Sequence, residues 1–346
     1  MSRVLLLHTG GTLGMRPRQP DLALEPDEIG GALLSHVPEL GELAEIETRV
    51  LCNVDSSDMS SSHWIQIAEE IHEALSGETP SYDGVVITHG TDTMAYTACA
   101  LSYQLRNLPR PVILTGSQRP LAEPSTDARA NLVGAVDLAT RGVPEVAIYF
   151  HGQLLRGNRS VKRSNFAYGA FYSPNYPVLA EVGTEIHWVG EQLFPQGPFS
   201  RVGAFDHRVG VIKLLPQQDA SMLRCLVGAG LRALVLGAFG AGNIPVETSG
   251  VGAAIQELRD AGTWVCIGSA SDHGRVDMTR YAGGILAQKS GALGIHDMTV
   301  EAASIKLMYL LGTLDAEETA LPGIDSATPT LPQAFKTPLA GEVTPQ

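Results

Sequence analysis

The feature that most constrains this chain is a regular alternation of short apolar runs with longer helical patterns. Helical spacing of apolar residues predicts helices over residues 62–75 and 93–105. Runs rich in β-branched residues or leucine predict five strands in the first half, at residues 4–7, 50–54, 85–88, 112–115 and 146–150. Because strands that alternate with helices usually lie parallel, the order predicts an α/β fold with a mostly parallel sheet flanked by helices.

A polar stretch rich in glycine and proline interrupts this alternation at residues 190–208. Beyond it, strands are predicted at residues 209–214, 233–237 and 263–267, and helices at 221–229, 252–261 and 300–311. We therefore expect an N-terminal domain over residues 1–190, a linker over 191–208 and a smaller C-terminal α/β domain over 209–346. The tail from residue 316 is rich in proline and threonine, and we expect it on the surface.

Charge and cysteine content exclude several classes of protein. The 346 residues include 24 Lys and Arg against 37 Asp and Glu, a net charge of −13. An acidic surface repels phosphate, so we expect neither nucleic acid nor an anionic membrane as a partner. The four cysteines are far apart and show no metal-ligand spacing, which argues against disulfides and a zinc site: Cys52, Cys99, Cys225 and Cys266.

The apolar runs are also short. The one at the N-terminus is too short for a signal peptide and lacks a small-residue cleavage site. No segment reaches the roughly 18 apolar residues of a membrane helix. These features predict a cytoplasmic protein.

Small polar residues follow each of the first four predicted strands of the N-terminal half. The loops read TGGT at residues 9–12, DSSD at 55–58, HGTDT at 89–93 and GSQ at 116–118. In an open parallel sheet, ligands bind beyond the carboxyl ends of the strands. We therefore expect the loops to form one crevice rich in hydroxyl groups and hydrogen-bond donors.

Each loop by itself has a simpler interpretation. Thr91, Asp92 and Thr93 precede a helix and are residue types that cap helices. Residues 55–58 are equally consistent with a turn followed by a cap. Gly10 and Gly11 suit a tight turn; a phosphate cradle is the weaker alternative, because TGGTLG lacks the G-x-G-x-x-G spacing of dinucleotide sites.

A basic cluster lies further along the chain, in RGNRSVKRSN. It contains Arg156, Arg159, Lys162 and Arg163. A run of like charges is typical of a solvated face, and its spacing does not single out Lys162.

Two motifs resemble the signatures of the bacterial-type L-asparaginases. They are TGGTLGM at residues 9–15 and THGTDTMAYTA at residues 88–98. The similarity to the cytoplasmic type I branch runs along the chain, through VDSSDM, TGSQRPLAE, RGNRSVKRSN, YSPNYPVLAEVG, DMTVEA and GEVTP. It implies an enzyme that hydrolyses L-asparagine to L-aspartate and ammonia, needs no cofactor or metal, and forms a homodimer or homotetramer.

The resemblance also implies a role for each matching residue. Thr12 corresponds to the nucleophile of the TGGT motif. A second catalytic set would consist of Thr91, Asp92 and Lys162. Five further positions would bind substrate: Asp55, Ser56 and Ser57 at its α-amino and α-carboxylate groups, Ser117 beside the side-chain amide, and Asn243 of FGAGN as an outer contact.

These roles agree with the chemistry of the side chains. A threonine hydroxyl is a poor nucleophile until a base takes its proton. Neutral Lys162 could accept that proton directly or through Thr91, whereas Asp92 beside it would favour the ammonium form. Loop N–H groups near Thr12 and Thr91 could stabilise the oxyanion, and a proton must reach the departing ammonia.

The chain departs from the family pattern in two places. The family's mobile lid carries a tyrosine after TGGT, whereas the matching segment RPRQPDLALEP, residues 16–26, aligns Leu22 there. We therefore expect slower acylation. An allosteric arginine of some type I enzymes aligns with Gly237, and Val161 and Ser271 also differ, which predicts hyperbolic kinetics.

Three alternatives are weighed against this interpretation, and the third is disfavoured. One extra methylene is worth only about 1–3 kcal/mol in a pocket, so a glutaminase of broader specificity is possible. A non-catalytic amino-acid binder that lacks the lid tyrosine is the second. The third is part of an archaeal tRNA-dependent amidotransferase, whose extra N-terminal domain has no room before Thr9.

Overall fold

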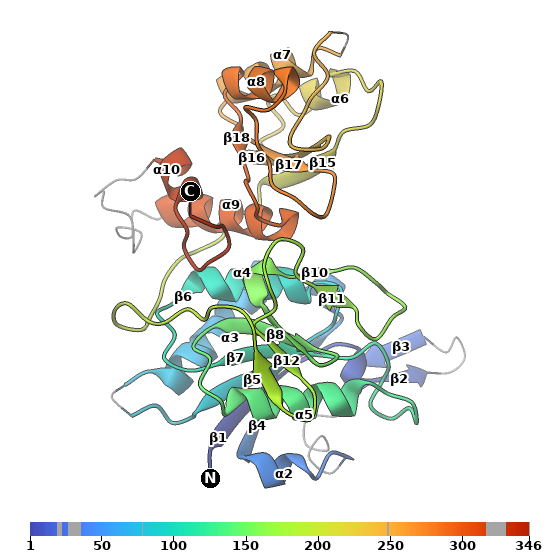
Figure 1. Cartoon of the computed structure of the whole chain (residues 1–346), viewed down its shortest axis with the longest axis vertical. Coiled ribbons are helices and arrows are strands. Elements are labelled where there is room, and N and C mark those ends of the chain that lie inside the picture. The colour runs from blue at the N-terminus through green and yellow to red at the C-terminus, as the bar shows by residue number, and fades with distance from the viewer. Residues whose placement is uncertain (19–22, 27–35, 78, 248, 316–329, 346) are drawn as a thin grey trace. The chain divides into compact units, whose positions relative to one another are not determined.

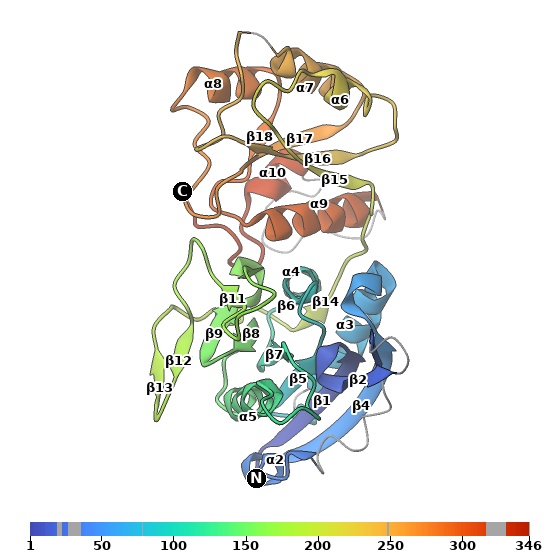
Figure 2. The same cartoon turned by 90° about the vertical axis from the view of Figure 1, so that its right-hand side faces the viewer.

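The computed structural model describes residues 1–18, 23–26, 36–77, 79–247, 249–315 and 330–345. The chain divides into two compact units, Met1–Val202 and Gly203–Gln346 (Figure 1, Figure 2). The division falls inside the expected linker. Part of that segment forms β14 (Ser200–Arg201), which pairs with β6 (Leu105–Arg106) of the first unit.

The first unit contains an eight-stranded sheet in the order β13-β12-β9-β8-β7-β5-β1-β4. The five strands from β8 to β4 are parallel, and β9, β12 and β13 are antiparallel additions. The bounds are β1 (Arg3–Gly10), β4 (Glu45–Val54), β5 (Gly84–Thr88), β7 (Val112–Thr115), β8 (Val146–Phe150), β9 (Gln153–Arg156), β12 (Ala180–Val182) and β13 (Ile186–Trp188). All five predicted strands are confirmed.

Helices cover both faces of this sheet. Alternate residues of β1 enter different cores, with Leu5 and Leu7 in one and Val4 and Leu6 in the other. The first core also contains residues of α3 (Ser61–Leu75) and α4 (Met94–Gln104). The second contains residues of α2 (Leu40–Leu43) and α5 (Ala128–Ala139). Burial on both faces explains why β1, β5, β7 and β8 read as continuous apolar runs.

The second unit has a smaller sheet of four parallel strands in the order β15-β16-β17-β18. The strands are β15 (Val209–Lys213), β16 (Ala233–Ala238), β17 (Trp264–Ser269) and β18 (Leu293–Gly294). The helices are α6 (Ser221–Arg224), α7 (Val251–Asp260), α8 (Ala282–Lys289), α9 (Val300–Asp315) and α10 (Leu331–Lys336). The predicted α/β architecture is confirmed, although α6 stops short of the expected residue 229. None of the described helices is long and apolar enough to cross a bilayer.

The prediction that the tail lies on the surface is wrong for part of residues 330–345. Leu331 and Phe335 of α10 are buried, as is Glu342. The ammonium group of Lys306, on α9, donates to the carbonyl oxygens of Phe335 and Thr337 at 2.8 and 2.7 Å. Buried charge and backbone contacts thus hold a segment whose composition suggested a solvated loop; residues 316–329 lie outside the described residues.

Candidate active site

The sheet brings the four polar loops to one edge. In the parallel pairs, His8 of β1 is level with Thr88 of β5, and Thr88 is level with Thr115 of β7. Val54, the last residue of β4, is level with Gly10. The loops after β1, β4, β5 and β7 therefore begin side by side.

Glycines allow three of these loops to approach one another closely. Gly11 has φ 85°, and a Cβ atom there would lie 2.3 Å from the backbone nitrogen of Gly90. A Cβ atom on Gly90 would lie 2.6 Å from the Ser56 side chain. Thr12 directly follows Gly11, so this contact places Thr12 and Thr91 on adjacent segments.

Lys162 reaches the HGTDT loop from a different part of the chain. It lies in β10 (Val161–Lys162), which pairs with β11 (Phe171–Tyr172). Its Nζ atom donates to Thr91 Oγ1 at 2.7 Å and to Asp92 Oδ1 at 2.6 Å. The Lys162 side chain is 16% exposed, whereas that of Asp92 is 71% exposed. The structure therefore brings together three of the predicted residues.

The neighbouring arginines do not form the expected solvated face. The Arg156 side chain is 4% exposed and pairs at 2.6 Å with Glu145, whose side chain is 2% exposed. Its guanidinium carbon lies 4.5 Å from the centre of the Tyr176 ring, and that of Arg159 lies 4.9 Å from it. The prediction is wrong for Arg156 and Arg159, because a buried carboxylate and an aromatic face replace water around them.

The expected substrate loop forms a short 3-10 turn after β4, η2 (Ser56–Asp58). Asp55 caps this turn, because its Oδ1 accepts from the Ser57 N–H at 2.8 Å. Ser56 is buried, and its carbonyl accepts from Thr93 Oγ1 at 2.7 Å. Thr93 precedes α4, but its side chain does not cap that helix; it joins the two loops instead. The turn predicted at residues 55–58 is thus confirmed, and the capping interpretation is wrong for Thr93.

The loop after β7 is held by a buried carboxylate. Asp127, 8% exposed, accepts from the backbone N–H groups of Gln118 and Arg119 at 3.0–3.1 Å. Ser117 is buried, and its hydroxyl donates to the Arg119 carbonyl oxygen at 2.6 Å. The Gln118 side chain touches Thr91, a contact that sequence reasoning missed although Gln118 stands beside Ser117 in the same motif.

A buried histidine lies under the HGTDT loop. His89 Nδ1 is 2.8 Å from the Gly90 carbonyl oxygen, which can only accept, so Nδ1 carries the proton. Nε2 then accepts from Thr97 Oγ1 at 2.9 Å, and Thr97 accepts from Trp64 Nε1 at 3.0 Å. Burial lowers the pKa of His89 to about 4, against a smaller opposing effect of the Gly90 hydrogen bond. The imidazole is therefore neutral near pH 7, and it is enclosed rather than facing a substrate.

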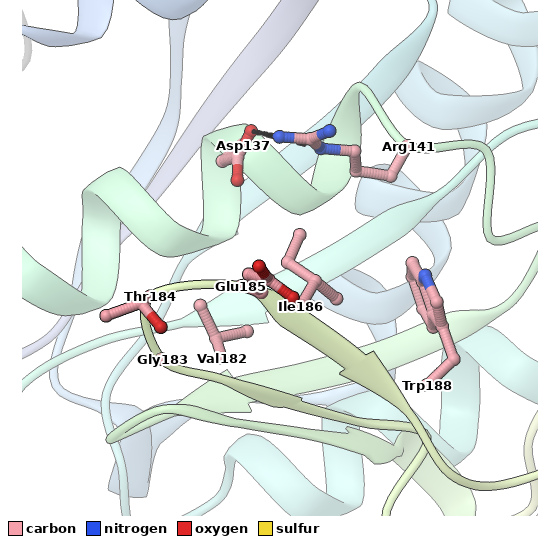
Figure 3. A pocket seen from close by; sticks show the side chains of 8 residues that line it. All are labelled: Asp137, Arg141, Val182, Gly183, Thr184, Glu185, Ile186 and Trp188. Atoms are coloured by element: carbon pink, nitrogen blue, oxygen red, sulfur yellow. Dashed lines mark hydrogen bonds and ion pairs between the residues drawn. The ribbon is translucent and has the colours of Figure 1, made fainter.

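A separate pocket of about 360 Å³ lies beside the end of α5 and the β12–β13 hairpin (Figure 3). None of the predicted site residues lines it. Arg141 lines this pocket, and its guanidinium group is paired with Asp137 at 2.8 Å. The loops at the strand ends therefore remain the candidate active site.

Comparison with known proteins gives the family. Residues 3–193 match the model "Asparaginase, N-terminal", and residues 208–320 match "Glutaminase/Asparaginase C-terminal domain". This chain belongs to the asparaginase family. The resemblance drawn from the TGGT and HGTDT motifs is thereby confirmed.

Individual relatives cover nearly the whole asparaginase-family chain. L-asparaginase 1 of Escherichia coli K12 is 36% identical, over 99% of this chain and 98% of its own length. A component of the glutamyl-tRNA(Gln) amidotransferase of Pyrococcus furiosus is 34% identical, over 99% of this chain and 77% of its own length.

Solved structures agree. The thermostable L-asparaginase of Thermococcus kodakarensis has a TM-score of 0.86 at 32% identity, covering 99% of this chain and 100% of its own. L-asparaginase I of Vibrio cholerae has a TM-score of 0.84 at 33% identity, covering 99% of both chains.

The remaining predicted residues of this family member lie elsewhere. Asn243 belongs to the second unit, in a turn after β16, where its N–H donates to the Phe239 carbonyl oxygen at 2.8 Å. Its role as an outer contact stays a prediction. Leu22 of the expected lid lies outside the described residues, although the backbones of β2 (Met15–Arg18) and β3 (Ala23–Pro26) pair in an antiparallel way.

The backbone offers donors that suit an oxyanion. Within the part of the chain that the structure describes, the N–H groups of Thr12 and Thr91 donate to no protein acceptor. Such groups stabilise negative charge that develops on a carbonyl oxygen.

No three His, Cys, Asp or Glu side chains among the described residues are arranged to hold a metal ion.

Proposed function

We propose that the chain is an L-asparaginase, which hydrolyses the side-chain amide of L-asparagine to L-aspartate and ammonia. One observation carries this proposal: in a member of the asparaginase family, Lys162 Nζ contacts both Thr91 Oγ1 and Asp92 Oδ1 beside the TGGT loop. The contact supplies a threonine hydroxyl, a base or acid, and a carboxylate that orients it.

In the proposed reaction Thr12 is the nucleophile. Its oxygen bonds to the amide carbon, and its proton passes to the neutral amine of Lys162, directly or through the Thr91 hydroxyl. The N–H groups of Thr12 and Thr91 face the developing oxyanion. The C–N bond then breaks, the nitrogen takes up a proton and departs as ammonia. Water cleaves the β-aspartyl ester and returns a proton to Thr12.

Substrate recognition follows from the neighbouring loops. We infer that Asp55 binds the α-amino group and that Ser56 and Ser57 bind the α-carboxylate. Ser117 would lie beside the side-chain amide, and Asn243 would make an outer contact. Asp55 and Ser57 are exposed, which supports access of a small polar substrate to that loop.

A glutaminase-asparaginase of broader specificity is the alternative within the same chemistry, and comparison of kcat/KM for asparagine and glutamine separates the two. We also infer a cytoplasmic homodimer or homotetramer that acts on free amino acid rather than on nucleic acid or membrane. Light scattering that returned the monomer mass, 36.7 kDa, would remove the inference about assembly.

The proposal is tested by ammonia release. The wild type should release ammonia from millimolar asparagine, and Thr12→Ala should lower kcat by about 10²-fold or more while aspartate still binds. Thr184→Ala, at an exposed turn of the same unit, is the control and should leave kcat unchanged. Near wild-type turnover by Thr12→Ala would overturn the assignment, and tight asparagine binding without release would indicate a binder.

A further inference from the structure

The side-chain amide of Gln118 bridges two parts of the candidate active site. Its Nε2 atom donates to the carbonyl oxygens of Ser164 at 3.3 Å and Ala167 at 3.2 Å. Carbonyl oxygens only accept, so the NH₂ group must face them and Oε1 must face the other way. On that side Oε1 lies 3.4 Å from Thr91 Oγ1.

While Lys162 is in its ammonium form, this arrangement sets the direction of the Thr91 hydroxyl. The ammonium form of Lys162 has only donors, so Thr91 Oγ1 accepts from it at 2.7 Å. The hydroxyl has a single proton, which it gives to Gln118 Oε1. The same oxygen is thus held from two sides, by Lys162 and by Gln118.

Hydrogen bonds hold the backbone of Gln118 in place. Its backbone N–H donates to both oxygens of the Asp127 carboxylate, at 3.1 and 3.0 Å. Asp127 also accepts from Asn131 Nδ2 at 3.1 Å, and Asn131 donates to the Gly116 carbonyl oxygen at 3.0 Å. The network ties the loop to α5, and the Gln118 side chain leaves from a backbone that cannot easily shift.

The side chain of Gln118 binds the loop of residues 163–170, which directly follows Lys162. Its ends are joined by a hydrogen bond from the Arg163 N–H to the Ala170 carbonyl oxygen at 2.8 Å. Inside it, the Ser164 hydroxyl accepts from the N–H groups of Phe166 and Ala167 at 3.1 and 2.9 Å. The two carbonyl oxygens that Gln118 binds therefore belong to an ordered loop.

We propose that Gln118 is a positioning residue for the amide hydrolysis described above, on which this inference rests. It fixes the Thr91 hydroxyl relative to the loop of residues 163–170, which directly follows Lys162. It acts on the reaction through these groups and does not touch substrate. Three charged groups lie near these residues. Asp92 pairs with Lys162, and Asp127 accepts from the Gln118 backbone N–H. The guanidinium carbon of Arg163 lies 5.3 Å from the centre of the Tyr172 ring.

Two substitutions separate the parts of this role. Gln118→Met keeps the length of the side chain but removes both donors and the acceptor. Gln118→Glu keeps an acceptor toward Thr91 but presents a carboxylate to two carbonyl oxygens and adds a negative charge near Lys162. Gln256→Met is the control, because Gln256 is exposed on α7 of the second unit.

The variants are compared by kcat, KM and hydrogen–deuterium exchange of residues 163–170. Gln118→Met should lower kcat about tenfold to a hundredfold, because a displacement near 1 Å can cost that much, while KM stays within about twofold. Exchange in residues 163–170 should rise in both variants.

The outcomes distinguish this inference from the proposed function. Wild-type protein that releases no ammonia in the same assay removes the proposed function, and this inference with it. Active wild type together with a Gln118→Met variant of unchanged kcat overturns the inference alone. A rise in KM with unchanged kcat would also overturn it, since it would place Gln118 in contact with substrate.

Discussion

Lys162 Nζ donates a hydrogen bond to Thr91 Oγ1 at 2.7 Å, across 71 positions of sequence. This contact makes the amino group of Lys162 part of the proposed proton path. Lys162→Met should lower kcat by about 10²–10⁴-fold, as loss of a general base does. Lys162→Arg should not restore it, because a guanidinium group keeps its proton. Turnover assays decide the point, with Lys213→Met on β15 as control; an active Arg variant would mean that positive charge alone suffices.

The contact between Gly11 and Gly90 predicts a steric effect. Gly11→Ala puts Cβ 2.3 Å from the Gly90 nitrogen at φ 85°, so the loops must separate. Gly142 is a matched control, because it has φ 81° but nothing within 4 Å of its Cβ position. Gly11→Ala should abolish turnover. Gly142→Ala should leave kcat unchanged and lower only the free energy of unfolding, by about 1 kcal/mol, through backbone strain. Equal kcat values in the two variants would show that the loops need not touch.

The charge pair between Lys306 and Glu342 predicts a large effect on stability. Both side chains are 0% exposed, and their charged atoms are 2.5 Å apart. Lys306→Met should lower the free energy of unfolding by about 3–5 kcal/mol, because it leaves a buried carboxylate without its cation.

A double variant checks the cause of that loss. Lys306→Met combined with Glu342→Gln should recover part of the stability, since the unpaired charge is then removed. Lys289→Met, exposed on α8, should stay within about 0.5 kcal/mol of wild type in the same denaturant titration. No recovery in the double variant would mean that Lys306 acts through its bonds to the carbonyl oxygens of the tail.

Acidification should destabilise the fold through His89. Burial lowers its pKa from 6.5 to about 4, so the unfolded chain binds more protons between these values. Stability from this group is complete above pH 6.5 and falls as the pH drops toward 4, by up to about 3 kcal/mol. Unfolding titrations should show a smaller slope between pH 6.5 and about 4 for His89→Gln than for wild type. An imidazole NMR signal of His89 that titrated near its ordinary pKa would contradict this account.

The sequence predicted the central strands because each is buried on both faces and therefore apolar along its length. It did not predict β12 and β13, which are short strands at one end of the sheet with exposed residues such as Trp188. Local composition also misjudged the tail, since the pairing of Lys306 with Glu342 is a tertiary contact. Charge counting could not show that Glu145 lies opposite Arg156.

The sequence also predicted only part of the candidate active site. Strand order alone placed the four loops at one edge, because parallel strands end together. Roles for Thr12 and Lys162 came from the family resemblance, as spacing could not select them. The link from Thr91 to Gln118 depends on side-chain packing and was not predicted.

The central claim is that Thr12 forms the acyl-enzyme, and the most direct measurement captures it. The protein is mixed with asparagine, quenched in acid within the first turnover, digested and examined by mass spectrometry. We predict a β-aspartyl ester on the peptide that contains Thr12, absent from the Thr12→Ala variant. An ester on Thr91 instead, or the same adduct in Thr12→Ala, would contradict the account.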